Sequence, residues 1–218
     1  MSVIAIDGPA GAGKSTVARR VAEAVGLPYL DTGAMYRCVA LKALRNNVDP
    51  VDEESVALIA EKASITLNGS VVLLDDEDVS HEIRTPEVAA VVSLIAVHSP
   101  VRNAMRLQQQ SWIEMNGGGV VEGRDIGTVV FPNADLKIFL TASPLERARR
   151  RVDQHGGDLH EVAQGIEERD RIDSTREDSP LKPAHDSITV DSTGKTVDDV
   201  VNEIVSAYRE IQEEKHHG

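Results

Sequence analysis

Short apolar runs alternate along the chain with longer stretches in which apolar positions recur every three or four residues. The short runs predict strands at 3–7, 28–31, 120–122, 136–140 and 187–191. Continuous apolar runs are typical of strands that are covered on both faces. Strands that alternate with helices in this way predict an α/β fold, with a five-stranded parallel sheet flanked by helices.

The helical stretches carry start and stop signals. The helix expected after Lys14 has apolar residues on one face and ends at Gly26. A further helix is expected to begin at Ser99, with Pro100 in its first turn. Ser143 and Glu146 form a capping-box pattern, in which the glutamate follows the capping serine by three residues.

Two stretches depart from the alternation of strands and helices. Residues 65–74 contain two β-branched runs around Asn68 and Gly69, and this pattern predicts a hairpin within a small antiparallel β insert. Gly156 and Gly157 are adjacent and lie between charged helical stretches. Because glycine permits many backbone conformations, this pair favours a hinged, mobile segment.

Residues 8–15 match the phosphate-loop pattern G-x-x-x-x-G-K-[ST] in full, directly after a predicted strand and before a predicted helix. Glycines let backbone N–H groups surround phosphate oxygens, and the start of the helix adds its positive end. Lys14 can reach the outer phosphates, and the Ser15 hydroxyl can ligate Mg²⁺. The alternative is a glycine-rich turn with an incidental lysine.

The composition limits the classes of partner. The chain has 218 residues and a net charge of −13, with 3% aromatic residues. A chain this acidic is unsuited to binding nucleic acid or an anionic membrane over a broad surface. Any polyanion that it binds must therefore be held locally by a few donors. A single cysteine, Cys38, and the lack of a targeting pattern at the N-terminus favour a cytoplasmic protein.

A phosphate loop alone leaves a switch GTPase, a motor ATPase and a small-molecule kinase open. An N-K-x-D motif for guanine is absent from the sequence, which disfavours the GTPase. Arginines follow the strand ends at Arg37 and Arg124, and others crowd residues 147–151 and 169–176. In an open parallel sheet, ligands bind beyond the carboxyl ends of the strands, so these arginines indicate a second anionic substrate. The alternatives are a helix cap, a turn salt pair and ion-paired, solvent-exposed helix faces.

Five segments together make the sequence resemble the bacterial cytidylate kinases, which belong to the nucleoside monophosphate kinases. They are residues 6–9 leading into the phosphate loop, 31–37 (DTGAMYR), 78–85 (DVSHEIRT), 122–132 (EGRDIGTVVFP) and 169–176 (RDRIDSTR). The resemblance runs almost from end to end. It implies a P-loop NTPase fold in one domain over 1–218, with a nucleoside-monophosphate-binding insert at about 32–99 and a mobile lid at about 151–168.

The resemblance also implies roles for individual residues. ATP would be bound by Gly8, Pro9, Ala10, Gly11, Ala12, Gly13, Lys14, Ser15, Thr16 and Arg147, with Ser15 as the Mg²⁺ ligand. CMP or dCMP would be bound by Thr32, Arg37, Ser93, Arg102, Arg124, Asp125, Arg169, Asp173 and Arg176. The charge that develops during transfer would be stabilised by Lys14, Arg124, Arg151 and Arg176. A small helical residue is the alternative for Ser93, and a surface residue is the alternative for Arg102.

The expected reaction is phosphoryl transfer from ATP to CMP or dCMP. The donors and acceptors of cytosine agree with this interpretation, because a carboxylate such as Asp125 can accept a hydrogen bond from the amino group that uracil lacks. Another small-molecule kinase, acting on UMP, AMP or shikimate, is the alternative within the class. A non-enzymatic nucleotide-binding regulator is the alternative outside it. By family resemblance the protein is expected to be a monomer.

Overall fold

The computed structural model describes residues 1–217 and divides into two compact units. The first unit comprises residues 1–29, 116–175 and 179–217, and the second comprises 30–115 and 176–178. The second unit contains the range 32–99 that the sequence predicts as an insert. Each unit is described separately below.

The first unit carries a parallel sheet, which confirms the predicted fold class. The strand order is β2 (Tyr29–Asp31), β6 (Gly118–Gly123), β1 (Ser2–Asp7), β7 (Leu136–Thr141) and β8 (Ile188–Asp191), and of β2 only Tyr29 belongs to this unit. β1 pairs in parallel with β6 and β7, and β7 pairs in parallel with β8. The five predicted strands are all present, and their ends differ from the predicted ones by at most two residues.

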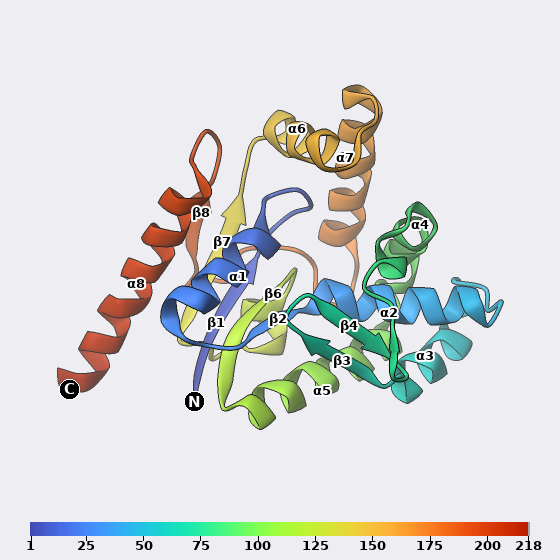
Figure 1. Ribbon diagram of the computed structural model, residues 1–218, viewed down its shortest axis with the longest axis horizontal. Helices are drawn as coiled ribbons and strands as arrows, with labels where there is room; N and C mark the ends of the chain where they lie inside the picture. Colours follow the sequence, from blue (N-terminus) through green and yellow to red (C-terminus); the bar gives the residue numbers. More distant parts are fainter. Residues whose placement is uncertain (218) are drawn as a thin grey trace. The chain divides into compact units, whose positions relative to one another are not determined.

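Two helices pack against one face of this sheet, α1 (Lys14–Val25) and α8 (Val197–His217) (Figure 1). They share a buried cluster with residues of β1, β6, β7 and β8, in which Ile4, Ile6 and Leu140 are almost fully buried. Burying an aliphatic side chain of this size contributes roughly 1.5–3 kcal/mol, so this cluster holds the strand ends firmly in place. The loop between β1 and α1 is thereby anchored at both of its ends.

The remaining helices of the first unit follow β6 and β7. A single π-helical turn, η2 (Ile126–Val130), comes just after β6 and was not expected from the sequence. α6 (Pro144–His155) begins at Ser143, whose hydroxyl accepts a hydrogen bond from Glu146 N at 3.3 Å, as the capping box predicts. α7 (Leu159–Thr175) follows the two glycines and packs against α6.

The second unit contains α2 (Thr32–Arg45), α3 (Glu53–Lys62), α4 (Pro86–Ile95), α5 (Ser99–Asn116) and a 3₁₀ turn, η1 (Glu82–Arg84). Its antiparallel sheet has the order β3 (Ile65–Asn68), β4 (Val71–Leu74), β5 (Glu77–Asp78). The predicted antiparallel insert is therefore confirmed, with β3 and β4 as the hairpin. β5 is too short and too acidic to be recognised in the sequence. Arg45 of α2 joins it to η1 through Glu77 and Glu82.

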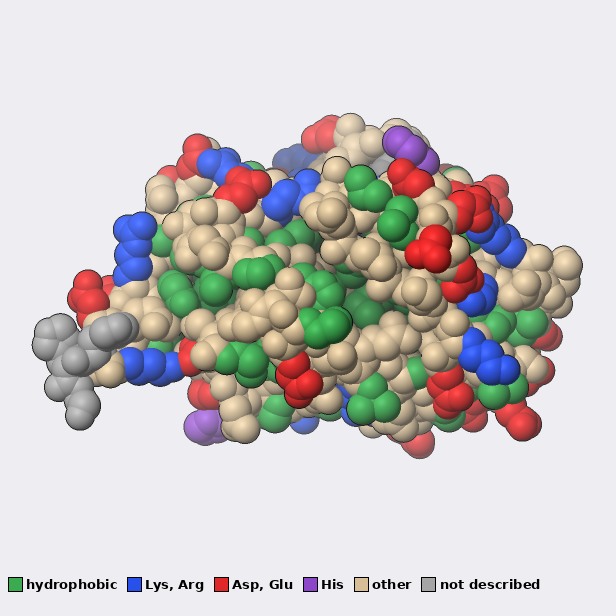
Figure 2. Space-filling view, turned by 60° about the horizontal axis from the view of Figure 1, so that its bottom comes forward, with side chains coloured by type: hydrophobic (Ala, Val, Ile, Leu, Met, Phe, Trp, Pro, Cys, Tyr) green, Lys and Arg blue, Asp and Glu red, His purple; other side chains and the backbone are tan. Residues whose placement is uncertain are grey.

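Charged side chains on the face shown in Figure 2 are interspersed, with Lys and Arg spread singly among Asp and Glu. Across residues 1–217, no single helix has the length and apolarity to cross a membrane, although α4 and α5, bent by 102° at their junction, reach that composition when taken together.

Candidate active site

The phosphate loop joins Asp7, the last residue of β1, to Lys14, the first residue of α1. Gly8, Gly11 and Gly13 have φ angles of 154°, 75° and 90°. A Cβ on Gly8 would lie 2.0 Å from the carbonyl oxygen of Leu140 in β7. Only glycine fits there without moving the strand, so the tight packing against β7 explains the first glycine of the motif.

Three peptide carbonyls of this loop are turned toward cationic side chains. Pro9 O accepts from Lys14 Nζ at 2.8 Å, Ala10 O accepts from Arg147 at 3.0 Å, and Ala12 O accepts from Arg150 at 3.3 Å. In a trans peptide the C=O and the following N–H point in opposite directions. Fixing the carbonyls therefore fixes the N–H groups of the following residues, which is the arrangement an anion-binding loop requires.

Lys14 is buried, with 6% of its surface exposed. Burial, followed by the positive charge of Arg124, lowers the pKa of Lys14 to about 7, and the nearby carboxylate of Glu122 opposes that shift. Glu122 in turn accepts a short hydrogen bond from the hydroxyl of Tyr29. A polyanion placed beside an amine with so low a pKa raises that pKa again, because the anion stabilises the charged form of the amine.

Arg124 follows β6 and forms an ion pair with Asp173 of α7, with Nε 2.8 Å from Oδ2. The charge and hydrogen bond of Asp173 raise the pKa of Arg124 despite the opposing effect of burial. The sequence predicts these two side chains for different parts of CMP, and the structure brings them together. A second arginine predicted for CMP, Arg169, lies on the same helix and acts electrostatically on Lys14.

Asp7 connects the end of β1 to the turn that follows Arg124 and Asp125. Its carboxylate accepts hydrogen bonds from Ile126 N at 2.8 Å and from Gly127 N at 2.7 Å. Burial raises the pKa of Asp7 to about 6, although these two hydrogen bonds act in the opposite direction. Asp125 itself is buried. The carboxylate of Asp7 thus fixes the backbone that carries Asp125.

Arg147 and Asp170 meet at the phosphate loop. Asp170 Oδ1 accepts from Ala10 N at 3.1 Å, and its other oxygen pairs with Arg147. Arg147 also donates to Ala142 O at 3.2 Å. A carboxylate of this chain therefore binds one of the loop's own N–H groups, as an anionic ligand would.

In the second unit, Asp31 caps α2 by accepting from Ala34 N at 2.9 Å. Thr32 is buried in the first turn of the helix. Asp31 also pairs with Arg37 at 2.9 Å, so Arg37 is ion-paired rather than simply solvated. The Nε of Arg37 is buried and has no hydrogen-bond partner, which leaves a donor suited to an anion.

Arg102 of α5 is 1% exposed, which excludes the alternative of a surface arginine. It lies over the ring of Tyr36 at 5.7 Å, donates to Ala96 O at 3.1 Å and lies 3.8 Å from Asp178. Ser93, on α4, is half-buried. Burial of a guanidinium is costly unless it is paired, so Arg102 is held by a specific polar environment.

The other residues predicted for the site are placed as follows. Arg176 is buried, and Ser15 and Thr16 lie exposed in the first turn of α1. Arg151 is exposed on α6. Their roles stay predictions. Within the described part of the chain there is no cluster of three or more His, Cys, Asp or Glu side chains that could hold a metal.

Several residues at the site were not predicted individually from the sequence, namely Asp7, Glu122, Arg150, Asp170 and Ser192. Asp7 gave a signal, since it is the charged last residue of an otherwise apolar strand. Arg150 and Asp170 lie within charged runs whose solvent-exposed members look the same in the sequence. Ser192 follows β8 and is 3% exposed. It lies in a short polar stretch of the sequence, which gives no sign that this serine is buried.

Comparison with known proteins finds relatives over nearly the whole chain. The chain is 50% identical over 211 residues to a cytidylate kinase of Desulforamulus reducens, covering 93% of this chain and 95% of that protein. It is also 50% identical over 218 residues to a bifunctional pantoate ligase/cytidylate kinase of Prochlorococcus marinus, covering 95% of this chain. The chain spans only 43% of the length of that relative.

Among solved structures, a shikimate kinase from Acinetobacter baumannii matches with a TM-score of 0.51 at 15% identity, over 96% of this chain and 94% of that one. At this identity the likeness concerns the fold alone. The family model described as cytidylate kinase matches residues 4–210, which is nearly the whole chain. The protein therefore belongs to the cytidylate kinase family.

Proposed function

We propose that the protein transfers the γ-phosphoryl group of ATP to CMP or dCMP, giving ADP and CDP or dCDP. The observation that carries this proposal is the buried Lys14, set at the end of a glycine-rich loop and beside Arg124. Membership of the cytidylate kinase family supports CMP as the acceptor.

In this reaction an oxygen of the CMP phosphate attacks the γ-phosphorus in line, and ADP leaves. The acceptor is already an anion, so the reaction needs no dedicated general base. Catalysis is then positioning together with neutralisation of charge. Lys14 and Arg124 supply positive charge from the first unit. Arg151 and Arg176 are proposed to add to it.

The ATP phosphates are proposed to bind the N–H groups of residues 8–16, with Arg147 at the nucleotide. The fit rests on the left-handed glycines of the loop and on carbonyls that are already turned toward cations. Mg²⁺ would be held by the Ser15 hydroxyl and would neutralise phosphate charge. A site with few protein ligands suits Mg²⁺, which keeps several waters and binds largely through substrate phosphates.

The residues proposed for CMP belong to both units. Arg124, Asp125, Arg169 and Asp173 are in the first unit, whereas Thr32, Arg37, Ser93, Arg102 and Arg176 are in the second. Within the first unit, Arg124 is proposed for the phosphate, Asp173 and Arg169 for the sugar, and Asp125 for cytosine. Within the second, Thr32, Arg37 and Arg176 are proposed for the phosphate, and Ser93 and Arg102 for cytosine. The segment at about 151–168 is proposed as a lid that excludes water during transfer. A monomer in the cytoplasm is proposed as well.

A coupled assay of ADP release tests the function directly, with CMP, dCMP, UMP, AMP and shikimate offered in turn. Faster turnover of CMP or dCMP than of the other acceptors is expected. Preference for UMP, AMP or shikimate would move the protein to another acceptor class. ATP binding without transfer to any acceptor would favour a nucleotide-binding regulator.

The variant Lys14→Ala should nearly abolish turnover. Its matched control is Lys195→Ala. Like Lys14, Lys195 follows a glycine and precedes a residue with a hydroxyl group, but it is exposed and paired with Glu203 at 2.7 Å. Lys195→Ala should retain turnover. A fully active Lys14→Ala enzyme would contradict the role of the phosphate loop.

A further inference from the structure

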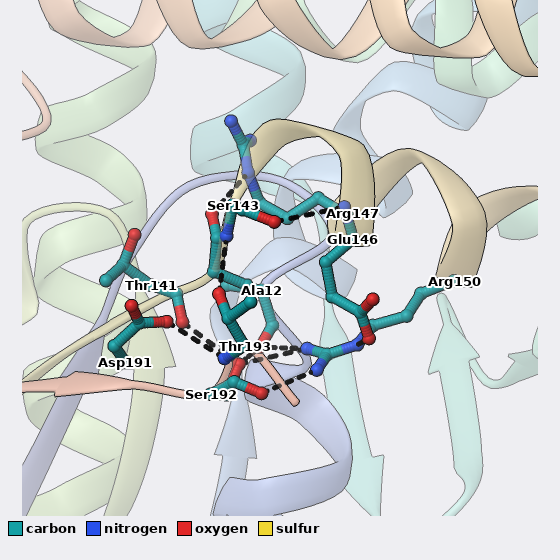
Figure 3. A network of polar contacts seen from close by, with 10 residues as sticks. Ala12, Thr141, Ser143, Glu146, Arg147, Arg150, Asp191, Ser192 and Thr193 are labelled. Atoms are coloured by element: carbon teal, nitrogen blue, oxygen red, sulfur yellow. Dashed lines mark hydrogen bonds and ion pairs between the residues drawn. The ribbon is translucent and has the colours of Figure 1, made fainter. Parts of the chain in front are cut away.

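Two segments of the first unit, α6 and the turn after β8, converge on one carbonyl oxygen, that of Ala12 in the phosphate loop (Figure 3). It accepts from Arg150 Nη1 of α6 at 3.3 Å, and the hydroxyl oxygen of Ser192, which follows β8, lies 3.3 Å from it as well. Arg150 also donates from Nη1 to Ser192 Oγ at 3.0 Å and from Nη2 to Ser192 O at 2.8 Å. The guanidinium fork therefore joins the turn after β8 to the phosphate loop.

The Ala12 carbonyl lies outside the hydrogen-bond ladder of α1. The first carbonyl of the helix to accept is that of Gly13, which binds Val17 N at 3.1 Å. Gly13 has a φ of 90° and no side chain to restrict the peptide before it. The orientation of the Ala12–Gly13 peptide is thus held by Arg150, whose guanidinium is in turn fixed by Ser192, rather than by helix geometry. Because the peptide is trans, holding its oxygen also fixes the direction of Gly13 N–H.

Both side chains are themselves held in place. Arg150 Nε donates to Glu146 Oε1 at 3.1 Å, one helical turn earlier on α6. Ser192 is 3% exposed, and its N–H donates to Thr141 O, at the end of β7, at 2.9 Å. Its hydroxyl oxygen also lies 2.9 Å from Thr141 O, and because a hydroxyl carries one proton it donates either there or to Ala12 O. A planar guanidinium with this many fixed partners is preorganised, and a lysine cannot reproduce its fork.

We propose that Arg150 and Ser192 are positioning residues, which fix the Ala12–Gly13 peptide so that the phosphate loop is preset for ATP. Neither residue needs to contact the nucleotide, since the donors of Arg150 named above are directed at protein atoms. This inference rests on the proposed function, because it assumes that the loop binds the ATP phosphates.

The test compares Arg150→Lys, Arg150→Met and Ser192→Ala with the control Arg149→Met. Arg149 lies on the same helix and is exposed, so its variant removes the same charge. The readouts are kcat, the KM for ATP, the KM for CMP and the dissociation constant of ATP from calorimetry. The melting temperature reports on folding.

Both Arg150 variants should raise the KM and the dissociation constant for ATP about tenfold, because a lost charged hydrogen bond in a buried site commonly has an effect of this size. Ser192→Ala should give a smaller increase of the same kind, about threefold. The KM for CMP should change less than twofold, and Arg149→Met should resemble the wild type. The double variant Arg150→Met/Ser192→Ala should raise the dissociation constant for ATP by less than the product of the two single increases. The two effects are coupled because both residues act on the same peptide.

Three results would overturn the proposal. Wild-type ATP affinity in Arg150→Lys, with a loss only in Arg150→Met, would show that charge alone matters. Equal losses for ATP and CMP would indicate a general structural role. Unchanged ATP affinity in both Ser192→Ala and Arg150→Met would remove the basis of the inference. Calorimetry with ATP needs no acceptor, so these results are separate from a failure of the proposed transfer to CMP.

Discussion

Arg124 and Asp173 are joined by an ion pair of 2.8 Å between segments that lie 49 residues apart in the sequence. Their side chains are 19% and 7% exposed, so the pair lies largely out of water. Arg124 lowers the pKa of Lys14 and Asp173 raises it. The carboxylate of Asp173 therefore stabilises two neighbouring cations that would otherwise repel each other, and it links α7 to the end of β6.

Replacing Asp173 with Asn should weaken CMP binding and destabilise the fold. The uncompensated Arg124 would cost about 1–3 kcal/mol of unfolding free energy, and the KM for CMP should rise by about tenfold, more than the KM for ATP. Urea denaturation and steady-state kinetics measure the two effects.

The matched control is Glu168→Gln, which breaks the exposed pair of Glu168 with Arg171 on the same helix. An exposed pair of this kind contributes little, so neither stability nor kinetics should change measurably. If the two variants behaved alike, the Arg124–Asp173 pair would have no special role.

Much of the architecture follows from local sequence signals. The apolar runs, the glycines of residues 8–13 and the capping serine at 143 each act over a few neighbouring residues, so the strands, the phosphate loop and the start of α6 could be predicted. The Asn68-Gly69 turn specified its hairpin in the same way. For Asp31 and Thr32 local pattern was not enough, because either side chain can cap a helix and the structure uses Asp31.

The polar contacts of the site could not be predicted from such signals. Asp170 binds Ala10 N across 160 residues of sequence, and Asp7 binds Gly127 N across 120. Each is one carboxylate among many in an acidic chain. Which of them reaches a buried N–H group depends on how strands and helices pack, and no short-range pattern encodes that.

Gly8→Ala should be strongly destabilising. Its Cβ would lie 2.0 Å from Leu140 O, a backbone atom in the sheet, so either β7 or the phosphate loop must move. A cost of about 4 kcal/mol or more in unfolding free energy is expected, together with loss of ATP binding. Gly194→Ala is the control, because Gly194 has a φ of 69° and nothing within 4 Å of a Cβ.

The control should cost only about 1–2 kcal/mol, which is the strain of a left-handed residue alone. Thermal and urea unfolding measure both variants. If Gly8→Ala and Gly194→Ala lowered the unfolding free energy equally, the close approach of Gly8 to β7 would not contribute to stability.

Asp7 should make the stability depend on pH in a defined direction. Its pKa rises from 3.8 to about 6 on folding, so between these values the native state binds more protons than the unfolded state. The part of the unfolding free energy due to Asp7 is therefore fully present below pH 3.8 and is lost as the pH rises to about 6. As the pH rises through this window, the unfolding free energy of the wild type should fall relative to that of Asp7→Asn.

Asp186→Asn provides a contrast, because the hydrogen bond from Lys137 lowers the pKa of Asp186. The contribution of Asp186 is present above pH 3.8 and is lost as the pH falls through its lowered pKa, so its slope has the opposite sign. Urea denaturation at closely spaced pH values separates the two. A wild-type slope that persists in Asp7→Asn would assign the effect to another group.

Asp125→Ala should change the choice of base more than the affinity for ATP. Asp125 is buried, and the carboxylate of Asp7 holds the backbone that directly follows it. A carboxylate accepts a hydrogen bond from the amino group of cytosine but opposes the oxygen that uracil carries there. Removing it should lower the preference for CMP over UMP in kcat/KM by about tenfold, because each unmatched buried polar group costs roughly 1–3 kcal/mol. Competition kinetics with the two nucleotides measures the ratio, and an equal fall in ATP affinity would argue against base recognition by Asp125.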